Sequence, residues 1–287
     1  DALQLARSWL KEGQILAIKG LGGFHLACDA TNAAAVDRLR ARKLRSDKPF
    51  ALMAFDRQEI ERHCEITPAE GALLESRERP VVLLQRRLDS PIARAVAPNL
   101  NTLGFMLPYT PLHTLLLEPA EGAPAVLVMT SGNLSEEPIA FRDDDAVERL
   151  ANLADAFLLH DRPIHMRVDD SVATMVAEQP YLLRRARGYA PEPIRLGQPM
   201  RPILAAGAEL KNTFCLTRQE YAFLSHHIGD LENYETLRSF EEGIEHFERL
   251  FRIQPEVIAC DLHPDYLATR YAHARADREN LPLVAVQ

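Results

Sequence analysis

The chain has 287 residues, which suggests two domains, and 47% of them are hydrophobic, enough to form buried cores. Its formal net charge of −8 argues against nucleic-acid binding driven by overall charge. No apolar stretch approaches the roughly 20 residues that span a bilayer. The 4 cysteines are dispersed and form no CxxC pair, so a reducing, cytoplasmic compartment is indicated, without a disulfide framework or a cysteine zinc site. The start, Asp-Ala-Leu, has no methionine or signal peptide, and we expect that it was cut from something longer.

Strands alternate with helices along the first 190 residues or so, a pattern that indicates an α/β architecture. Apolar spacing predicts helices over residues 3–11, 33–45 and 144–154. A glycine-rich turn occupies residues 19–23. Short apolar runs predict strands at residues 15–18, 50–55, 81–85, 125–129, 157–160 and 171–176.

A proline-rich stretch at residues 193–202 predicts a linker between a first domain, residues 1–192, and a second, residues 203–287. In the second domain we predict two paired strands at residues 213–216 and 221–224. An apolar helical face follows over residues 237–251. Two more strands, at residues 257–260 and 283–286, are predicted to flank a helix.

A dense run of cations stands out in this acidic chain: Arg38, Arg40, Arg42, Lys43, Arg45 and Lys48. Such a run is usually a solvated helix face. However, Lys43 and Arg45 lie where the helix is expected to end, between two apolar strands, where the loops of α/β folds gather at the binding crevice. The planar fork of arginine and the compact charge of lysine suit a triphosphate and a small carboxylate-like group.

Three further segments carry polar groups that suit the same site. The segment TSGNLS (130–135) follows an apolar strand and can bind phosphate oxygens, although a polar turn with a helix cap explains it equally simply. Asp169 and Asp170, beside arginines, can hold Mg²⁺, order the arginines or form surface ion pairs. The basic segment RRARGYAP (184–191) either closes over phosphates or anchors the linker. No P-loop, GxGxxG or GxSxG motif is present.

Several segments, taken in order, resemble the YrdC-like domain of the HypF family, the carbamoyltransferases of [NiFe]-hydrogenase maturation. They are IKGLGGFHLACDA (18–30), RKLRSDKPFALM (42–53), LPYTPLH (107–113), MTSGNLSEEPI (129–139), HDRPI (160–164), RVDDSV (167–172) and RRARGYAP (184–191). The later segments AAGAELKNTFCL (205–216), HIGDL (227–231) and DLHPDY (261–266) resemble the opening of that family's next domain. The resemblance implies a YrdC-like open twisted α/β sheet followed by a truncated actin-like (ASKHA) α/β domain.

The resemblance also implies roles for individual residues. The Lys-x-Arg and Ser-x-Asn pairs of the family match Lys43, Arg45, Ser131 and Asn133, so Lys43 and Arg45 are expected to be catalytic and the other two to bind nucleotide. The remaining expected nucleotide contacts are Lys19, Lys48, Thr130, Ser135, Arg167, Arg185 and Arg187. The expected substrate contacts are His25, Pro108, Tyr109, Thr110 and His113, and no metal ligand is expected.

The reaction implied by the resemblance starts from carbamoyl phosphate, from which an acylphosphatase domain frees carbamate. The YrdC-like domain couples carbamate to ATP, with Mg²⁺, to give carbamoyl-adenylate and pyrophosphate. The last domain then transfers the carbamoyl group to the C-terminal cysteine of the partner HypE. No general base is assigned, because carbamate is already anionic. The acylphosphatase, zinc-finger and final metal-site regions are missing, so zinc and a second metal are expected only in the full-length family protein, and we expect this chain to adenylate without completing transfer.

Three other functions stay open. The first is synthesis of threonylcarbamoyl-adenylate for tRNA modification, against which the second domain and the HDRPI segment argue. The second is a double-stranded-RNA-binding module without chemistry, which the net charge of −8 disfavours. The third is an antibiotic carbamoyltransferase, which shares both folds and which the sequence separates poorly. We expect neither membrane nor nucleic acid as a partner.

Overall fold

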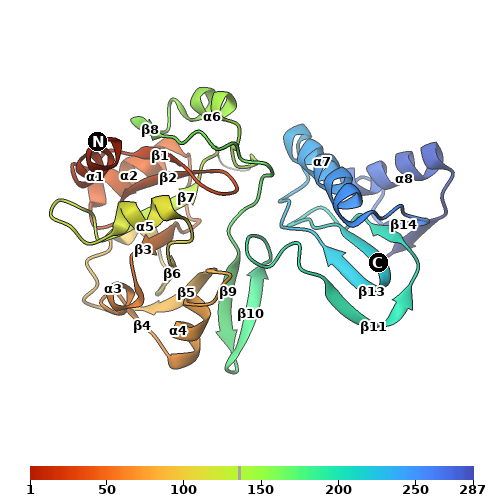
Figure 1. Cartoon of the computed structure of the whole chain (residues 1–287), viewed down its shortest axis with the longest axis horizontal. Coiled ribbons are helices and arrows are strands. Elements are labelled where there is room, and N and C mark those ends of the chain that lie inside the picture. The colour runs from red at the N-terminus through yellow and green to blue at the C-terminus, as the bar shows by residue number, and fades with distance from the viewer. Residues whose placement is uncertain (135–136) are drawn as a thin grey trace. The chain divides into compact units, whose positions relative to one another are not determined.

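The computed structural model describes residues 1–134 and 137–287 of the chain. These residues form two compact units. Unit 1 comprises residues 1–134 and 139–188, and unit 2 comprises residues 137–138 and 189–287. Each unit has its own sheet, covering helices and hydrophobic core (Figure 1). Within the described residues, no helix is both long and apolar enough to cross a bilayer.

Unit 1 is built around a mixed sheet of 10 strands in its described part. The strands are β1 (Leu16–Lys19), β2 (Phe24–Asp29), β3 (Ala51–Ala54), β4 (Cys64–Glu65), β5 (Val81–Arg86), β6 (Thr102–Met106), β7 (Val126–Ser131), β8 (Ala156–Leu158), β9 (Val172–Val176) and β10 (Gln179–Arg184). Their order is β10-β9-β5-β6-β3-β7-β2-β1-β8, with β4 paired to β5. The central strands β7 and β2 are antiparallel, and His25 lies directly opposite Ser131 in their register.

Helices cover both faces of this sheet. They are α1 (Ala2–Lys11), α2 (Ala33–Arg42), α3 (Arg57–Glu61), α4 (Pro68–Leu74), α5 (Pro111–Leu117) and α6 (Asp143–Leu150), with a 3₁₀ turn at Arg94–Val96. Leu39 of α2 packs in one core with Leu26 of β2, whereas Leu10 of α1 and Leu116 of α5 pack in another with Ala27. Successive residues of β2 point to opposite faces of the sheet. Because both faces are covered, β2 is buried along its whole length.

The end of α2 decides where two of the cations go. The helix was predicted to reach residue 45, but it ends at Arg42, with Lys43 as its C-terminal cap. Leu44 then adopts the left-handed conformation, with φ of 51°, and its side chain is 82% exposed. A left-handed residue turns the chain away from the helix axis. Lys43 therefore stays at the C-terminal end of α2, whereas the backbone at Arg45 runs in a different direction.

Unit 2 contains a five-stranded sheet in the order β11-β13-β12-β14-β15. Its elements are β11 (Ile194–Met200), β12 (Ile203–Ala205), β13 (Cys215–Leu224), α7 (Tyr234–Phe251), β14 (Val257–Asp261), α8 (Leu267–Glu279) and β15 (Leu283–Val286). Phe214, Phe240 and Phe247 form the aromatic centre of its core, with ring centroids 5.1 and 5.9 Å from that of Phe214.

Most predicted elements are confirmed, but the strand pair predicted in unit 2 is wrong. The stretch predicted as a linker, residues 193–202, includes β11, which pairs with β13 in the sheet of unit 2. The predicted strand pair at residues 213–216 and 221–224 is the single strand β13. The chain does not reverse between the two halves. Instead, Leu216 pairs with β12 and Ala222 with β11.

Candidate functional site

The Ser131–Asn133 turn forms the floor of the candidate site. Thr130 and Ser131 are the last residues of β7, not residues beyond it as predicted. The Gly132 amide donates to the Phe24 carbonyl at 2.6 Å, and the Gly132 carbonyl accepts from the Ala140 amide at 2.8 Å. A Cβ atom on Gly132 would lie 2.7 Å from that Phe24 carbonyl. The turn is therefore pressed against β2, and only glycine fits there without a shift of the backbone.

Lys43 reaches this turn from the end of α2 and is 1% exposed. Its ammonium group donates to the carbonyl oxygens of Ser131 at 2.7 Å and Asn133 at 2.6 Å, and to Asn133 Oδ1 at 3.0 Å. The Ser131 hydroxyl donates to the same Oδ1 at 2.7 Å. The predicted Lys-x-Arg and Ser-x-Asn residues thus meet through Lys43, although they are far apart in the sequence.

Arg45 lies beside the same strand end and is half-buried. Its Nε donates to the Lys48 carbonyl at 3.0 Å, and its terminal nitrogens donate to the Pro49 carbonyl at 2.7 Å and to Thr130 Oγ1 at 3.3 Å. Burial, together with the smaller effects of the Arg40 and Arg184 charges, lowers the pKa of Arg45 to about 10. Within the described residues Arg45 makes no ion pair with a carboxylate, so an arriving oxyanion would relieve this crowding of cations.

The other cations of the run have structural roles. Arg38 and Arg42 donate to backbone carbonyls outside α2, and Arg42 also pairs with Asp155 at 2.8 Å. Arg40 donates to the carbonyl of Ala95 and to those of the loop that carries Arg45. The guanidinium groups of Arg40 and Arg45 lie 4.6 and 5.1 Å from the ring centre of Phe50. Our reasoning from the sequence missed Phe50. Its position directly after the run of cations was the available signal.

Several expected nucleotide contacts are placed elsewhere or are engaged by the protein. Lys19 is buried, and its ammonium group pairs with Asp143 at 2.7 Å and donates to the His160 carbonyl at 2.9 Å, so it is a structural residue. Lys48 is exposed, and only its carbonyl is used, by Arg40 and Arg45. Arg167 lies 5.1 Å from the ring centre of Phe141, and Arg185 is half-buried. Ser135 lies outside the described residues.

Arg187 belongs to a second, buried cluster. Its Nε donates to Asp170 at 2.7 Å, its terminal nitrogens donate to the Glu78 and Arg79 carbonyls at 2.9 Å, and its guanidinium lies 3.4 Å from the centre of the Tyr109 ring. Arg187 is therefore an internal anchor, and the prediction that it contacts nucleotide is not supported by this geometry. Burial alone would raise the pKa of Asp170, but Arg187 and the His25 hydrogen bond hold it well below its usual range.

His25 completes this cluster and connects it to the turn. Its Nε2 lies 3.0 Å from Asp170, and because a carboxylate only accepts, Nε2 must carry the hydrogen. His25 also sits opposite Ser131 in the β2–β7 register, which places the two side chains side by side on one face. Asp170 thus orders an arginine and a histidine, which is the second of the roles expected for this acidic pair.

The remaining expected substrate contacts differ in burial and in hydrogen bonding. Thr110 caps α5 by accepting from the His113 amide at 3.2 Å, and Pro108 and Tyr109 are half-buried. His113 is fully buried, and neither ring nitrogen has a hydrogen-bond partner among the described residues. Burial, and to a smaller extent the nearby His25, lowers the pKa of His113 to about 3. His113 and His25 are therefore buried and closed to ligands in this structure.

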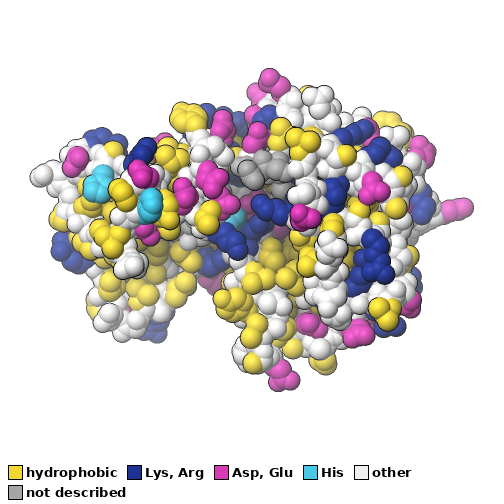
Figure 2. Space-filling view, turned by 180° about the vertical axis from the view of Figure 1, so that it is seen from behind, with side chains coloured by type: hydrophobic (Ala, Val, Ile, Leu, Met, Phe, Trp, Pro, Cys, Tyr) yellow, Lys and Arg dark blue, Asp and Glu magenta, His cyan; other side chains and the backbone are white. Residues whose placement is uncertain are grey.

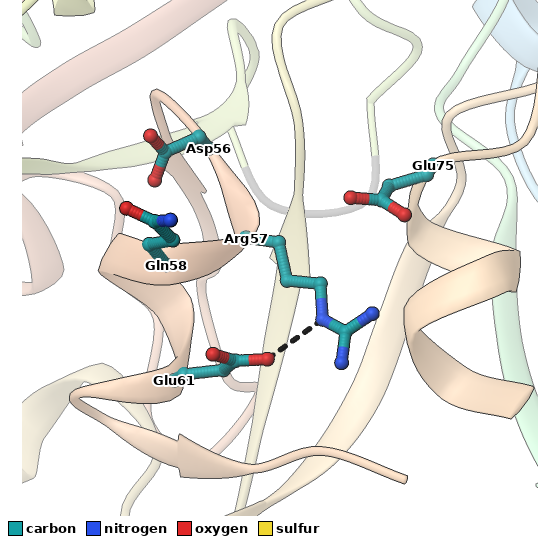
Figure 3. A pocket seen from close by; sticks show the side chains of 5 residues that line it. All are labelled: Asp56, Arg57, Gln58, Glu61 and Glu75. Atoms are coloured by element: carbon teal, nitrogen blue, oxygen red, sulfur yellow. Dashed lines mark hydrogen bonds and ion pairs between the residues drawn. The ribbon is translucent and has the colours of Figure 1, made fainter. Parts of the chain in front are cut away.

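Two hollows on the surface share no residue with this site. One, of about 460 Å³, is lined by Asp56, Arg57, Gln58, Glu61 and Glu75, and an Arg57–Glu61 ion pair of 2.7 Å joins two of these side chains on α3 (Figure 3). The other, of about 830 Å³, lies in unit 2 and is lined by residues that include Arg252 and Arg275. Nowhere in the described part of the chain do three His, Cys, Asp or Glu side chains gather as metal ligands.

The charged side chains of the surface are mixed. On the face shown in Figure 2, Lys and Arg side chains are interspersed with Asp and Glu over most of the view, with small basic groups near its centre and on its right. Binding to double-stranded RNA without chemistry would need a broad basic surface. This face does not offer one.

Comparisons with known proteins agree with this fold. A family model for Sua5, YciO and YrdC proteins, described as "Telomere recombination", matches residues 8–186, and one for the HypF Kae1-like domain matches residues 198–287. A crystal structure of full-length HypF in the phosphate- and nucleotide-bound form superposes with a TM-score of 0.94 at 48% identity, covering 99% of this chain and 44% of that one. For T. kodakarensis HypF the TM-score is 0.95 at 38% identity, over 100% of this chain and 38% of that one.

Curated relatives give the same result. The carbamoyltransferase HypF2 of Cupriavidus necator is 48% identical over 97% of this chain and 36% of its own length. HypF of Synechocystis is 46% identical over 100% of this chain and 37% of its own length. The two matched models define a protein in which a YrdC-like domain precedes a Kae1-like domain. With these identities, the chain belongs to the HypF carbamoyltransferase family. It spans somewhat more than a third of the length of these curated relatives.

Proposed function

We propose that unit 1 activates carbamate with ATP, forming carbamoyl-adenylate and releasing pyrophosphate. The observation that carries this proposal is the Arg45 guanidinium, held beside Thr130 and the Ser131–Asn133 turn without a carboxylate partner among the described residues. Such a group binds an oxyanion. The HypF relative described as phosphate- and nucleotide-bound supports ATP as that ligand.

The protein contributes to this reaction mainly by positioning the reactants and by supplying positive charge. A carbamate oxygen forms a bond to the α-phosphorus of ATP, and the bond from that phosphorus to the bridging oxygen breaks, releasing pyrophosphate. Both reactants are anions, so Arg45 would lessen their repulsion and hold the phosphate in line. Since no group of three acidic or histidine ligands occurs in the described residues, Mg²⁺ would be held mainly by phosphate oxygens and water.

For the whole protein, we propose that carbamate comes from carbamoyl phosphate and that the carbamoyl group passes to the C-terminal cysteine of HypE, for the cyanide ligand of [NiFe]-hydrogenase. The HypF relatives named as carbamoyltransferases support this assignment. None of the 4 cysteines is in a disulfide, which supports a reducing, cytoplasmic location.

A second candidate is synthesis of threonylcarbamoyl-adenylate. The human threonylcarbamoyl-AMP synthase is 28% identical over 48% of this chain. P. abyssi Sua5, solved with L-threonine, shares the fold, with a TM-score of 0.58 at 14% identity.

ATP–pyrophosphate exchange decides between the two candidates. We expect exchange with an equilibrated ammonium carbamate solution and none that depends on threonine. Exchange that requires both threonine and bicarbonate would overturn the proposal in favour of the second candidate. Absence of exchange under either condition would reject both activities.

A further inference from the structure

We propose that Lys43 is a positioning residue that holds the Ser131–Asn133 turn and makes no contact with phosphate, whereas Arg45 contacts the phosphate directly. The inference rests on the proposed function and assigns different roles to the two residues of the Lys-x-Arg pair. The resemblance to the family had implied one catalytic role for both. The structure separates them by the direction of each side chain and by the donors that each has left.

The ammonium group of Lys43 has no donor to spare. A lysine ammonium carries three N–H bonds. Three acceptors lie within reach among the described residues: the carbonyl oxygens of Ser131 and Asn133 and Asn133 Oδ1, at 2.7, 2.6 and 3.0 Å. The residue is 1% exposed, so its ammonium group is shielded from water and depends on protein acceptors. To reach a phosphate, Lys43 would have to abandon buried acceptors and leave them unsatisfied.

Those same hydrogen bonds give the turn its shape. Asn133 Oδ1 receives both the Lys43 ammonium and the Ser131 hydroxyl, so the two side chains of the Ser-x-Asn pair are tied through one oxygen. The backbone adds the hydrogen bond from the Asn133 amide to the Ser131 carbonyl at 3.1 Å. Lys43 therefore fixes two of the three carbonyls of the turn and one side-chain oxygen.

Arg45 has what Lys43 lacks. A guanidinium group has five N–H bonds, and three of those of Arg45 are taken by Lys48, Pro49 and Thr130. One N–H on each terminal nitrogen remains without a partner among the described residues. These two N–H groups remain available to donate to an oxyanion. The side chain is half-buried and therefore accessible, in contrast to that of Lys43.

The first test needs no nucleotide. Amide hydrogen–deuterium exchange of the intact chain is measured for Lys43→Met, whose side chain has similar length and no charge, and for the matched control Lys11→Met on α1, whose side chain is 57% exposed. We expect the amides of residues 131–133 to exchange about tenfold faster or more in Lys43→Met, with no change in Lys11→Met. Unchanged protection in Lys43→Met would overturn the inference. Should Lys43→Met fail to fold, Asn133→Ala replaces it, because this variant removes only one of the three acceptors, and it must loosen the same amides.

The second test asks whether Lys43 touches phosphate. The ¹⁵N resonance of the Lys43 ammonium, assigned by its loss in Lys43→Met, is followed during titration with a non-hydrolysable ATP analogue. We expect its slow hydrogen exchange to persist and no coupling to ³¹P to appear. A coupling between this nitrogen and a phosphorus would overturn the inference while supporting the proposed function. If calorimetry shows that the analogue does not bind the wild-type chain, the proposed function fails, whereas the exchange test still decides whether Lys43 holds the turn.

Discussion

Replacing the buried His113 by phenylalanine should remove an acid-dependent loss of stability from unit 1. His113 has no exposed surface, and its pKa is lowered to about 3, chiefly by burial and then by His25. In an unfolded chain the pKa of histidine is about 6.5. Between these two values the unfolded chain binds one proton more than the folded chain. Stability therefore falls as the pH falls through this window, by roughly 1.4 kcal/mol for each pH unit.

The size of the effect follows from the difference between the pH of the solution and the pKa of His113 in the unfolded chain. At pH 5 the solution lies about 1.5 units below the unfolded pKa, so His113 should lower the free energy of unfolding by about 2 kcal/mol relative to pH 7. Phenylalanine keeps an aromatic ring against Tyr109, whose ring centroid lies 4.6 Å from that of His113, and does not titrate. The variant should therefore lose about 2 kcal/mol less than the wild type between pH 7 and pH 5.

Urea unfolding followed by tryptophan fluorescence is a suitable assay. The chain has a single tryptophan, Trp9 on α1, which packs against the same core cluster as Leu116 of α5. Its signal thus reports on the layer that contains His113. The control is His273→Gln on α8, where the side chain is exposed and no difference from wild type is expected. If wild type and His113→Phe lost the same free energy of unfolding between pH 7 and pH 5, the reasoning would be refuted. That result would show that the buried imidazole can be protonated in the folded chain without a large loss of stability.

Three further predictions concern the site. Arg45→Ala should lower the rate of pyrophosphate exchange about 10²–10³-fold with an unchanged unfolding midpoint, and normal exchange would contradict its role as oxyanion ligand. In Asp170→Asn, the amide oxygen must still accept from Arg187, so the NH₂ group faces His25 and should move the imidazole hydrogen from Nε2 to Nδ1. Histidine ¹⁵N chemical shifts would report the change of tautomer, and an unchanged tautomer would disprove the prediction. The free energy of unfolding of Asp170→Asn should also fall by roughly 3–5 kcal/mol, because a buried ion pair is broken. Gly132→Ala should displace the turn, because its Cβ would meet a backbone oxygen at 2.7 Å, and calorimetry that finds unaltered ATP affinity would count against the site.

The local features of this chain were predictable from the sequence because their causes are local. Apolar periodicity is sufficient to locate α1, α2, α7 and most strands, and a helix that stops near Lys43 is visible in the run of cations before a lysine–proline pair. The order of the quoted segments was sufficient to identify the family, and the comparisons confirmed it. These features depend on the spacing of neighbouring residues, which the sequence displays directly.

The fate of each charged side chain was decided only by the tertiary structure. Lys19, Lys43 and Lys48 are alike in sequence, yet one pairs with Asp143, one binds the turn after β7 and one is exposed. The acceptors of Lys43 lie 88 and 90 residues further along the chain, a separation over which sequence spacing predicts no contact. The same limit explains the residues predicted as a linker, which became a strand because β13 offered unpaired backbone groups. A buried ammonium or backbone amide must find an acceptor, and only the folded chain determines which acceptor is within reach.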